Sequence, residues 1–394
     1  MNTAVSGKTL LSKLMRRVVC LHFIFLYFLL NFAFVSATTT LTYTSDSSFV
    51  VPSGVTSITV KAWGAGGGSN TYTPFGGTAA GGGGYVKADV SVTAGNTLQI
   101  KVGTGGAAGT PATSGGLTGI FLGSVTHGNS LVVVGSGGSG GTWNNGNGGA
   151  GGGSTGAAAT SGGGGGTQVA GGAGGVYGGA AGSALTGGAP GGSYSQGGGY
   201  GGAGYYGGGG GGTVNGGSFY QGGGGGSSYI ISGSTNITNT QASGQTPPNT
   251  GDSDYPGSSV AYGGGVNASG YRGHVVISYV NPYPIVSTST VVSIASTGAT
   301  LGATLESIGS SSVTARGICY GISPSPTTNC TAEGGTATGT YTQSITGLAT
   351  STTYYFRGYA TNSYGTAYSE DSTFTTEGLT NSLMFDSSQS QYLS

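Results

Sequence analysis

Side chains able to carry chemistry are scarce in this chain. Its 394 residues include ten basic, ten acidic and three histidine side chains, far below the ~25% charged residues of ordinary soluble domains. His22, His127 and His274 lie too far apart in the sequence to indicate a zinc triad. Asp252-Ser253-Asp254 could add to a calcium site, but it lacks the ligand spacing of a calcium-binding loop, so we expect an exposed turn. The composition argues against catalysis, and we assign no catalytic, cofactor-binding or metal-binding residue.

Glycine motifs do not indicate nucleotide binding. Gly-x-Gly-x-x-Gly occurs often, but by chance in segments that are half glycine, and the full Gly-x-x-x-x-Gly-Lys-Ser/Thr phosphate loop is absent from the sequence.

The first 37 residues have the pattern of a secretory signal peptide. Lys8, Lys13, Arg16 and Arg17 precede an apolar run over 18–34, and Val35-Ser36-Ala37 offers small residues at its end. An uncleaved signal anchor is the alternative, because the run approaches the ~20 residues of a membrane span. Without 1–37, six basic and ten acidic side chains remain, a balance of −4. We therefore expect an extracellular or cell-surface protein with no further membrane span and no nucleic-acid partner, since binding phosphates needs clustered Lys and Arg.

Cysteines and asparagines offer modification sites in that setting. Cys319 and Cys330 are the two cysteines of the predicted mature chain, and an even pair in an oxidising compartment indicates a disulfide. Asn236, Asn267 and Asn329 are candidate glycosylation acceptors if the source is eukaryotic.

Aromatic residues within a glycine-rich stretch form the candidate ligand surface. They are Trp143, Tyr177, Tyr194, Tyr200, Tyr205, Tyr206, Phe219 and Tyr220. Surroundings so poor in bulky side chains cannot bury them all, so they could stack on sugars, contact a protein or associate with copies of the chain. The alternative, that they only cover the ends of the glycine-rich segments, remains open.

Short β-strands must position these residues. Apolar and polar side chains alternate with a period of two over 56–63, 85–92 and 98–102, and further strands are predicted at 131–134, 229–231 and 274–280. We expect an antiparallel β-sandwich or jelly roll spanning 41–280.

Between these strands lies an unusual glycine-rich tract. From Gly135 to Gly226, 47 of 92 residues are glycine and none is Asp, Glu, Lys or Arg. A flexible linker is one interpretation. Pure runs such as 207–212 and 222–226 instead favour extended polyglycine helices, packed parallel so that their backbone groups bond to one another.

The order of these elements resembles a known family. Residues 55–68 (VTSITVKAWGAGGG), Gly81 to Tyr85, the polyglycine runs and the closing 273–277 (GHVVI) are similar to the secreted glycine-rich domains of bacteria and eukaryotes, among them the extracellular module of the anaplastic lymphoma kinase and leukocyte tyrosine kinase receptors. The resemblance implies a β-sandwich bearing a bundle of polyglycine helices and, in the receptors, binding of protein ligands. No kinase catalytic motif is found in the chain.

A second domain, resembling fibronectin type III, is predicted over 282–376 after a proline-rich hinge. Strands are expected at 299–306, 312–320, 341–345, 353–362 and 366–375. Residues 347–365 resemble the fibronectin type III signature, although Thr350 replaces the usual Pro and Leu301 a common Trp. The resemblance implies that Tyr354 is the corner tyrosine, with its hydroxyl bonded back to the preceding turn. Phe356, Gly358 and Ala360 are then expected to face the core.

Residues 377–394 are predicted to be a linker and the truncated start of a lectin-like jelly roll. Asn381 to Asp386 and Gln391 to Ser394 resemble the opening strand of concanavalin A-like and laminin G-like domains. So short a segment cannot fold as that domain, so the chain is a fragment or ends in a frayed tail.

These observations predict an all-β, non-catalytic, modular protein with a structural, adhesive or binding function. Its expected partners are extracellular proteins or carbohydrates, with self-association as a further possibility. The alternatives are the ectodomain of a receptor-type protein and the non-catalytic part of a secreted polysaccharide-active enzyme.

Overall fold

The computed structural model describes residues 38–71, 77–142, 146–192, 198–214 and 219–378. The predicted signal peptide and the predicted lectin-like start at 379–394 lie outside the described residues. The chain divides into two compact units, Thr38–Pro282 and a second that begins at Tyr283. The regular structure of both units is β-strand, and the described residues contain one helical element, the 3₁₀ turn η1 (His127–Asn129). The all-β prediction is confirmed.

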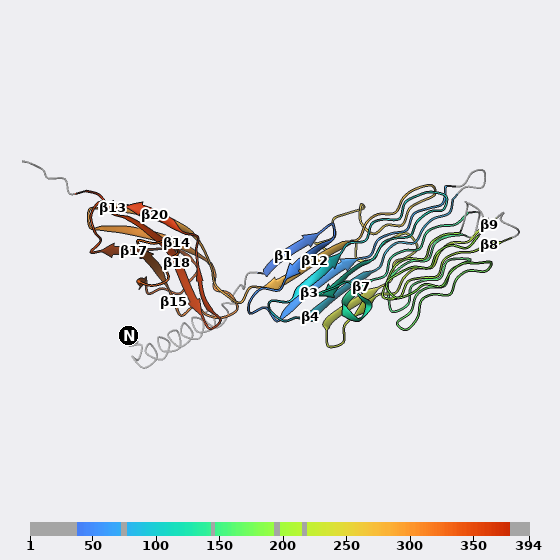
Figure 1. Cartoon of the computed structure of the whole chain (residues 1–394), viewed down its shortest axis with the longest axis horizontal. Helices are drawn as coiled ribbons and strands as arrows, with labels where there is room; N and C mark the ends of the chain where they lie inside the picture. The colour runs from blue at the N-terminus through green and yellow to red at the C-terminus, as the bar shows by residue number, and fades with distance from the viewer. Residues whose placement is uncertain (1–37, 72–76, 143–145, 193–197, 215–218, 379–394) are drawn as a thin grey trace, which may run out of the picture. The chain divides into compact units, whose positions relative to one another are not determined.

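Two five-stranded antiparallel sheets form the sandwich of the first unit (Figure 1). One has the order β1 (Thr38–Tyr43), β12 (His274–Val280), β3 (Ser57–Trp63), β4 (Tyr85–Ser91) and β11 (Thr235–Thr240). The other has the order β10 (Tyr229–Ile230), β7 (Ser130–Val134), β6 (Thr118–Leu122), β5 (Thr97–Lys101) and β2 (Ser47–Val50). The alternating residues of β3, Ile58, Val60 and Ala62, are buried in the core between the sheets, as their period of two predicts.

The glycine-rich segments beyond the sandwich are ordered and run alongside one another (Figure 1). The backbone N–H groups of 207–211 donate to three different neighbouring segments. Gly207 donates to Ser183 and Gly210 to Ala180, whereas Gly208 donates to Gly202 and Gly211 to Gly199. Gly209 donates to Gly164. Donors three residues apart therefore reach the same neighbouring segment, which is the symmetry of the threefold polyglycine helix.

Neighbouring polyglycine helices run in both directions. Gly163 and Gly166 donate to Gly222 and Gly225, so those two segments are parallel. The acceptors of Gly207 and Gly210 instead descend along the chain from 183 to 180, so these segments are antiparallel. The expected parallel packing is thus only part of the arrangement, because backbone groups that radiate in three directions can bond to neighbours of either direction.

Glycine is required where these helices meet. A Cβ on Gly208 would lie 2.2 Å from the carbonyl oxygen of Gly224, and a Cβ on Gly224 would lie 2.0 Å from that of Gly164. Short β8 (Thr213–Val214) and β9 (Phe219–Tyr220) pair with each other at the end of the bundle away from β1 (Figure 1).

A three-stranded and a five-stranded sheet form the second unit. One has the order β13 (Ile285–Ala295), β14 (Gly298–Ser307) and β17 (Gly339–Thr346). In the other, β16 (Cys330–Ala332), β15 (Ala315–Gly321), β18 (Thr353–Asn362) and β19 (Gly365–Tyr368) follow in order, and β20 (Ser372–Thr375) also pairs with β18. Phe356, Gly358 and Ala360 are buried, as predicted, and Leu301 is buried as well. The single strand expected over 366–375 is two strands. The Gly358 amide donates to the Ser369 hydroxyl and the Ser369 amide donates to the Gly358 carbonyl, which interrupts the regular strand pairing with β18.

The predicted disulfide and corner tyrosine are both present. Cys319 and Cys330 are bonded and lie directly opposite each other on β15 and β16. Cys330 is the first residue of β16. The Ala349 backbone N–H donates to the Tyr354 hydroxyl at 3.1 Å, which closes the turn before β18.

Candidate functional site

The predicted aromatic surface is only partly assembled. Trp143, Tyr194 and the side chain of Phe219 lie outside the described residues. Tyr177 is 73% exposed, and Tyr200 is half-buried. Tyr220 is buried, so its predicted place on the surface is wrong. It belongs to β9, where its backbone carbonyl accepts a hydrogen bond from Thr142 and its amide donates to the Thr142 hydroxyl, which draws the residue into the bundle.

Four rings form a cluster, here named the aromatic ladder, from Tyr229, Tyr205, His127 and Tyr206. The Tyr205 ring stacks on Tyr229 and on His127, with 4.0 Å between ring centroids in each pair. Two rings cannot occupy one face at that distance, so Tyr205 is covered on both faces. Tyr206 lies edge-on, 4.8 Å from His127 and 5.4 Å from Tyr205. Burial, together with Tyr229 and Tyr206, raises the pKa of Tyr205.

The ladder joins parts of the chain that are distant in sequence. His127 comes from η1 before β7, Tyr229 from edge strand β10, and Tyr205 and Tyr206 from the glycine bundle. All four side chains are half-buried, so their outer faces and edges meet solvent. The sequence singled out Tyr205 and Tyr206 but missed Tyr229 and His127, because only the pairing of β10 with β7 brings them together.

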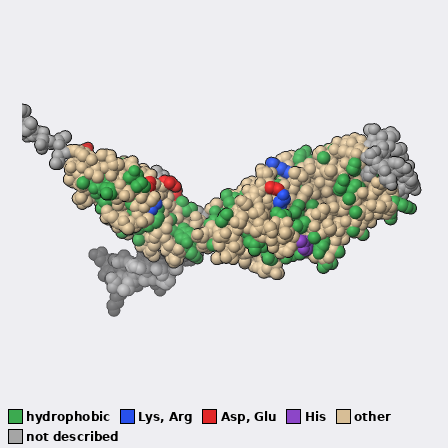
Figure 2. All heavy atoms as spheres, viewed as in Figure 1, with side chains coloured by type: hydrophobic (Ala, Val, Ile, Leu, Met, Phe, Trp, Pro, Cys, Tyr) green, Lys and Arg blue, Asp and Glu red, His purple; other side chains and the backbone are tan. Residues whose placement is uncertain are grey.

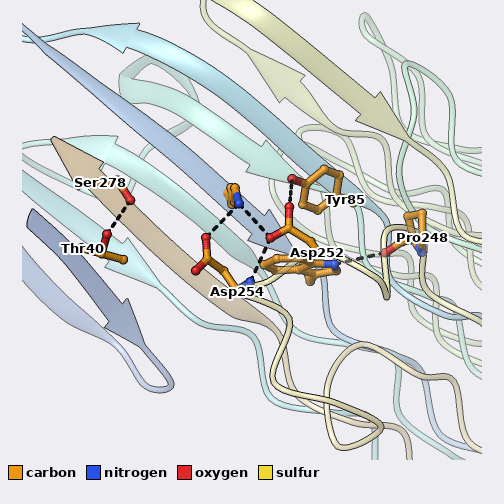
Figure 3. Close-up of polar contacts among 8 residues, drawn as sticks. Thr40, Tyr85, Pro248, Asp252, Asp254 and Ser278 are labelled. Carbon is orange, nitrogen blue, oxygen red and sulfur yellow. Dashed lines mark hydrogen bonds and ion pairs between the residues drawn. The ribbon is translucent and has the colours of Figure 1, made fainter. Parts of the chain in front are cut away.

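A second cluster in the first unit consists of charged side chains that stabilise the fold (Figure 3). The Lys61 ammonium group lies 2.7 Å from Asp252 and 2.8 Å from Asp254, and the Tyr85 hydroxyl donates to Asp252 at 3.4 Å. The expected turn at Asp252-Ser253-Asp254 is present, but its two carboxylates are half-buried and ion-paired rather than exposed. Both carboxylates bind one ammonium group on β3 and tie the loop after β11 to the sheet.

Burial and charge change the acid–base behaviour of this cluster. Burial opposes ionisation of Asp252, but bonds from Lys61, the Asp254 amide and Tyr85 outweigh it and lower the pKa of Asp252. Burial and the negative charge of Asp252 raise the pKa of Tyr85 to about 12. Asp252 is therefore an ionised structural anchor at neutral pH rather than a proton-transfer group.

The same loop covers Trp63, which is fully buried. Its indole N–H donates to the Pro248 carbonyl at 3.1 Å (Figure 3), and its ring packs against Tyr85, Tyr255 and His274. Burial and the nearby Arg272 lower the pKa of His274. The end of β3 at Trp63 thus belongs to a second small core on the outer face of its sheet.

The remaining predicted sites lie at the surface. Asn236, Asn267 and Asn329 are all exposed, as glycosylation acceptors must be. Within the described part of the chain, no group of three or more His, Cys, Asp or Glu side chains could hold a metal ion. No helix among the described residues is long and apolar enough to cross a membrane.

Comparisons with known proteins add little. No family model matches the chain, and no curated protein matches its sequence. Among solved structures, the fibronectin type III domain of human fibronectin type III domain containing protein 3 is similar, with 17% sequence identity and a TM-score of 0.20. The match covers 26% of this chain and 94% of that domain.

Proposed function

We propose that this chain is a secreted or cell-surface modular protein with a structural, adhesive or binding role and no catalytic one. The observation that carries the proposal is the aromatic ladder, held between the sandwich and a bundle whose segments are tied by backbone hydrogen bonds. Aromatic rings fixed on a rigid support lose little conformational entropy when they bind a partner.

The use of acidic side chains supports a non-catalytic role. Asp89 accepts from Thr59 at 2.6 Å, Asp252 and Asp254 hold Lys61, and Glu333 accepts from Arg316 at 2.9 Å. Carboxylates engaged in such contacts stabilise the fold and are not poised to transfer protons.

Secretion and binding are tested separately. The full chain, carrying a C-terminal tag and expressed in a secretory host, should enter the medium with Thr38 at its N-terminus. It should then be retained on at least one surface from a panel of immobilised extracellular proteins and neutral polysaccharides. The proposal would be contradicted if the chain stays inside the cell, or if the secreted chain binds to no surface of the panel.

A variant pair tests the ladder itself. Tyr229→Ala removes one outer ring, and we expect it to weaken retention about tenfold, since one buried aromatic contact contributes roughly that much. Tyr364→Ala removes a tyrosine that is 49% exposed in the second unit and should leave retention unchanged. Equal retention of both variants would place the binding surface elsewhere. Sedimentation of the same samples tests self-association.

A further inference from the structure

A pocket of about 540 Å³ lies in the first unit, apart from the aromatic ladder. Its walls come from the turn between β1 and β2, the end of β5 and its connection to β6, and Arg272, which lies two residues before β12. Its volume is in the range of small-molecule sites. The backbone of Gly103 and Gly116 forms part of the lining, and a Cβ on Gly103 would lie 2.1 Å from the Gly116 carbonyl oxygen. Side chains larger than hydrogen are therefore excluded there.

Charge converges on this pocket in a unit that has little. Lys101, Arg272 and Asp46 all line it, which leaves a net charge of +1. Figure 2 shows how rare charged side chains are on the visible face, where most of the surface is tan or green. Two cations in one pocket are thus a large share of the charge of the unit.

Arg272 is the cation available to a ligand. Its side chain is exposed, and among the described residues its guanidinium group makes one hydrogen bond, to the Thr44 carbonyl at 3.2 Å, and no ion pair. A guanidinium group carries five N–H donors in a planar fork that matches a carboxylate. Lys101 instead pairs with Asp46, which also accepts from the Val102 amide at 2.9 Å.

The rest of the lining suits a hydroxylated ring. Thr44, Ser45 and Thr104 line the pocket, and no hydrogen bond of their hydroxyl groups is found within the described residues. Asp46 offers acceptor oxygens, and Leu117 offers a half-buried apolar face. Sugar rings present hydroxyls at their edge and C–H groups on their face, so both kinds of group have partners here.

We propose that this pocket binds an acidic sugar, with its carboxylate on Arg272 and its hydroxyls on Asp46 and the hydroxyl side chains around it. A uronic acid of an extracellular polysaccharide has this chemistry. An acidic sugar is favoured over a peptide C-terminus because the lining is rich in hydroxyl groups. That the sugar comes from an extracellular polysaccharide rests on the proposed extracellular function, but the binding of an acidic sugar to the pocket does not.

Titration calorimetry of the full chain with trigalacturonate is the test, with neutral galactotriose as the matched sugar. We expect binding of the acidic sugar alone. Arg272→Gln should weaken it tenfold or more, because charge-assisted bidentate bonds are strong. Lys87→Gln removes the same charge from the outer face of β4 and should leave the affinity unchanged.

Several results would overturn the proposal. The first is that the neutral sugar binds as tightly as trigalacturonate. The second is that Arg272→Gln keeps the affinity of the unaltered chain, or that Lys87→Gln loses as much affinity as Arg272→Gln. The third is that an acetylated tripeptide or a short DNA duplex binds more tightly than trigalacturonate. Circular dichroism of each variant excludes misfolding as the cause. If the chain binds trigalacturonate but fails the secretion and retention assays, only the proposed function is refuted. If it passes those assays but does not bind trigalacturonate, only the proposed sugar site is refuted.

Discussion

Replacing Gly208 with alanine should break the polyglycine bundle locally. The new Cβ would lie 2.2 Å from the Gly224 carbonyl oxygen, so the neighbouring helix must retreat by roughly 1 Å to restore ordinary contact. The Gly224 amide donates to the Gly209 carbonyl at 2.9 Å, and the Gly224 carbonyl accepts from Gly202 at 2.8 Å; neither bond survives such a shift intact.

The expected magnitude follows from these contacts. Overpacking costs about 1–3 kcal/mol, and each weakened hydrogen bond about 1 kcal/mol. The sum is a loss of about 3–5 kcal/mol in the free energy of unfolding, or a drop of about 6–20 °C in Tm for a unit of this size.

Gly251→Ala is the matched control. A Cβ at Gly251 has no atom within 4 Å, so this variant should differ from the unaltered chain by less than about 1 kcal/mol. Thermal unfolding by circular dichroism gives the two Tm values, and hydrogen exchange of peptides from 198–212 and 219–226 shows where protection is lost. Equal Tm values, or fast exchange of these peptides already in the unaltered chain, would refute the packed bundle and favour a linker.

Three further perturbations test other contacts. Asp252→Asn should lower the free energy of unfolding at neutral pH by about 1–3 kcal/mol, since it weakens a partly buried ion pair. Because the folded pKa of Asp252 lies below its usual value of 3.8, this stabilisation is complete above that value and fades as pH falls through the folded pKa. Denaturant titrations of the two proteins should therefore differ at neutral pH and converge only well below pH 3.8. The exposed Glu370→Gln should follow the unaltered chain throughout. Replacing Cys319 and Cys330 together with serine should destabilise the second unit by about 2–3 kcal/mol, and denaturant curves unaffected by reduction of the unaltered chain would contradict this. Tyr354→Phe removes the acceptor of the Ala349 amide and should cost about 1 kcal/mol; Tyr364→Phe, at an exposed tyrosine, should cost nothing measurable by the same titration.

The sequence by itself determined the local elements. Alternation in β3, β4 and β14 identified these strands, because a period of two puts every second side chain on one face. The pure glycine runs identified the threefold helices, because only glycine permits helices to pack at that distance. The signature around Tyr354 likewise located the corner tyrosine and the buried Phe356.

Several of the strands that escaped prediction lack a strong apolar pattern. β1 is mostly threonine and its side chains alternate only between exposed and half-buried, β11 is polar and largely exposed, and β16 has three residues. Each is held by pairing to a neighbour, which local sequence does not encode.

Only the tertiary structure decided which distant residues meet. The aromatic ladder depends on β10 pairing with β7, and Lys61 meets Asp252 and Asp254 across almost two hundred residues. The pocket of Asp46, Lys101 and Arg272 likewise gathers three segments. Side-chain periodicity shows which face of a single strand is buried. These sites depend instead on the order of the strands in the sheets and on a loop that folds over a sheet. Both are set by contacts between residues far apart in the sequence.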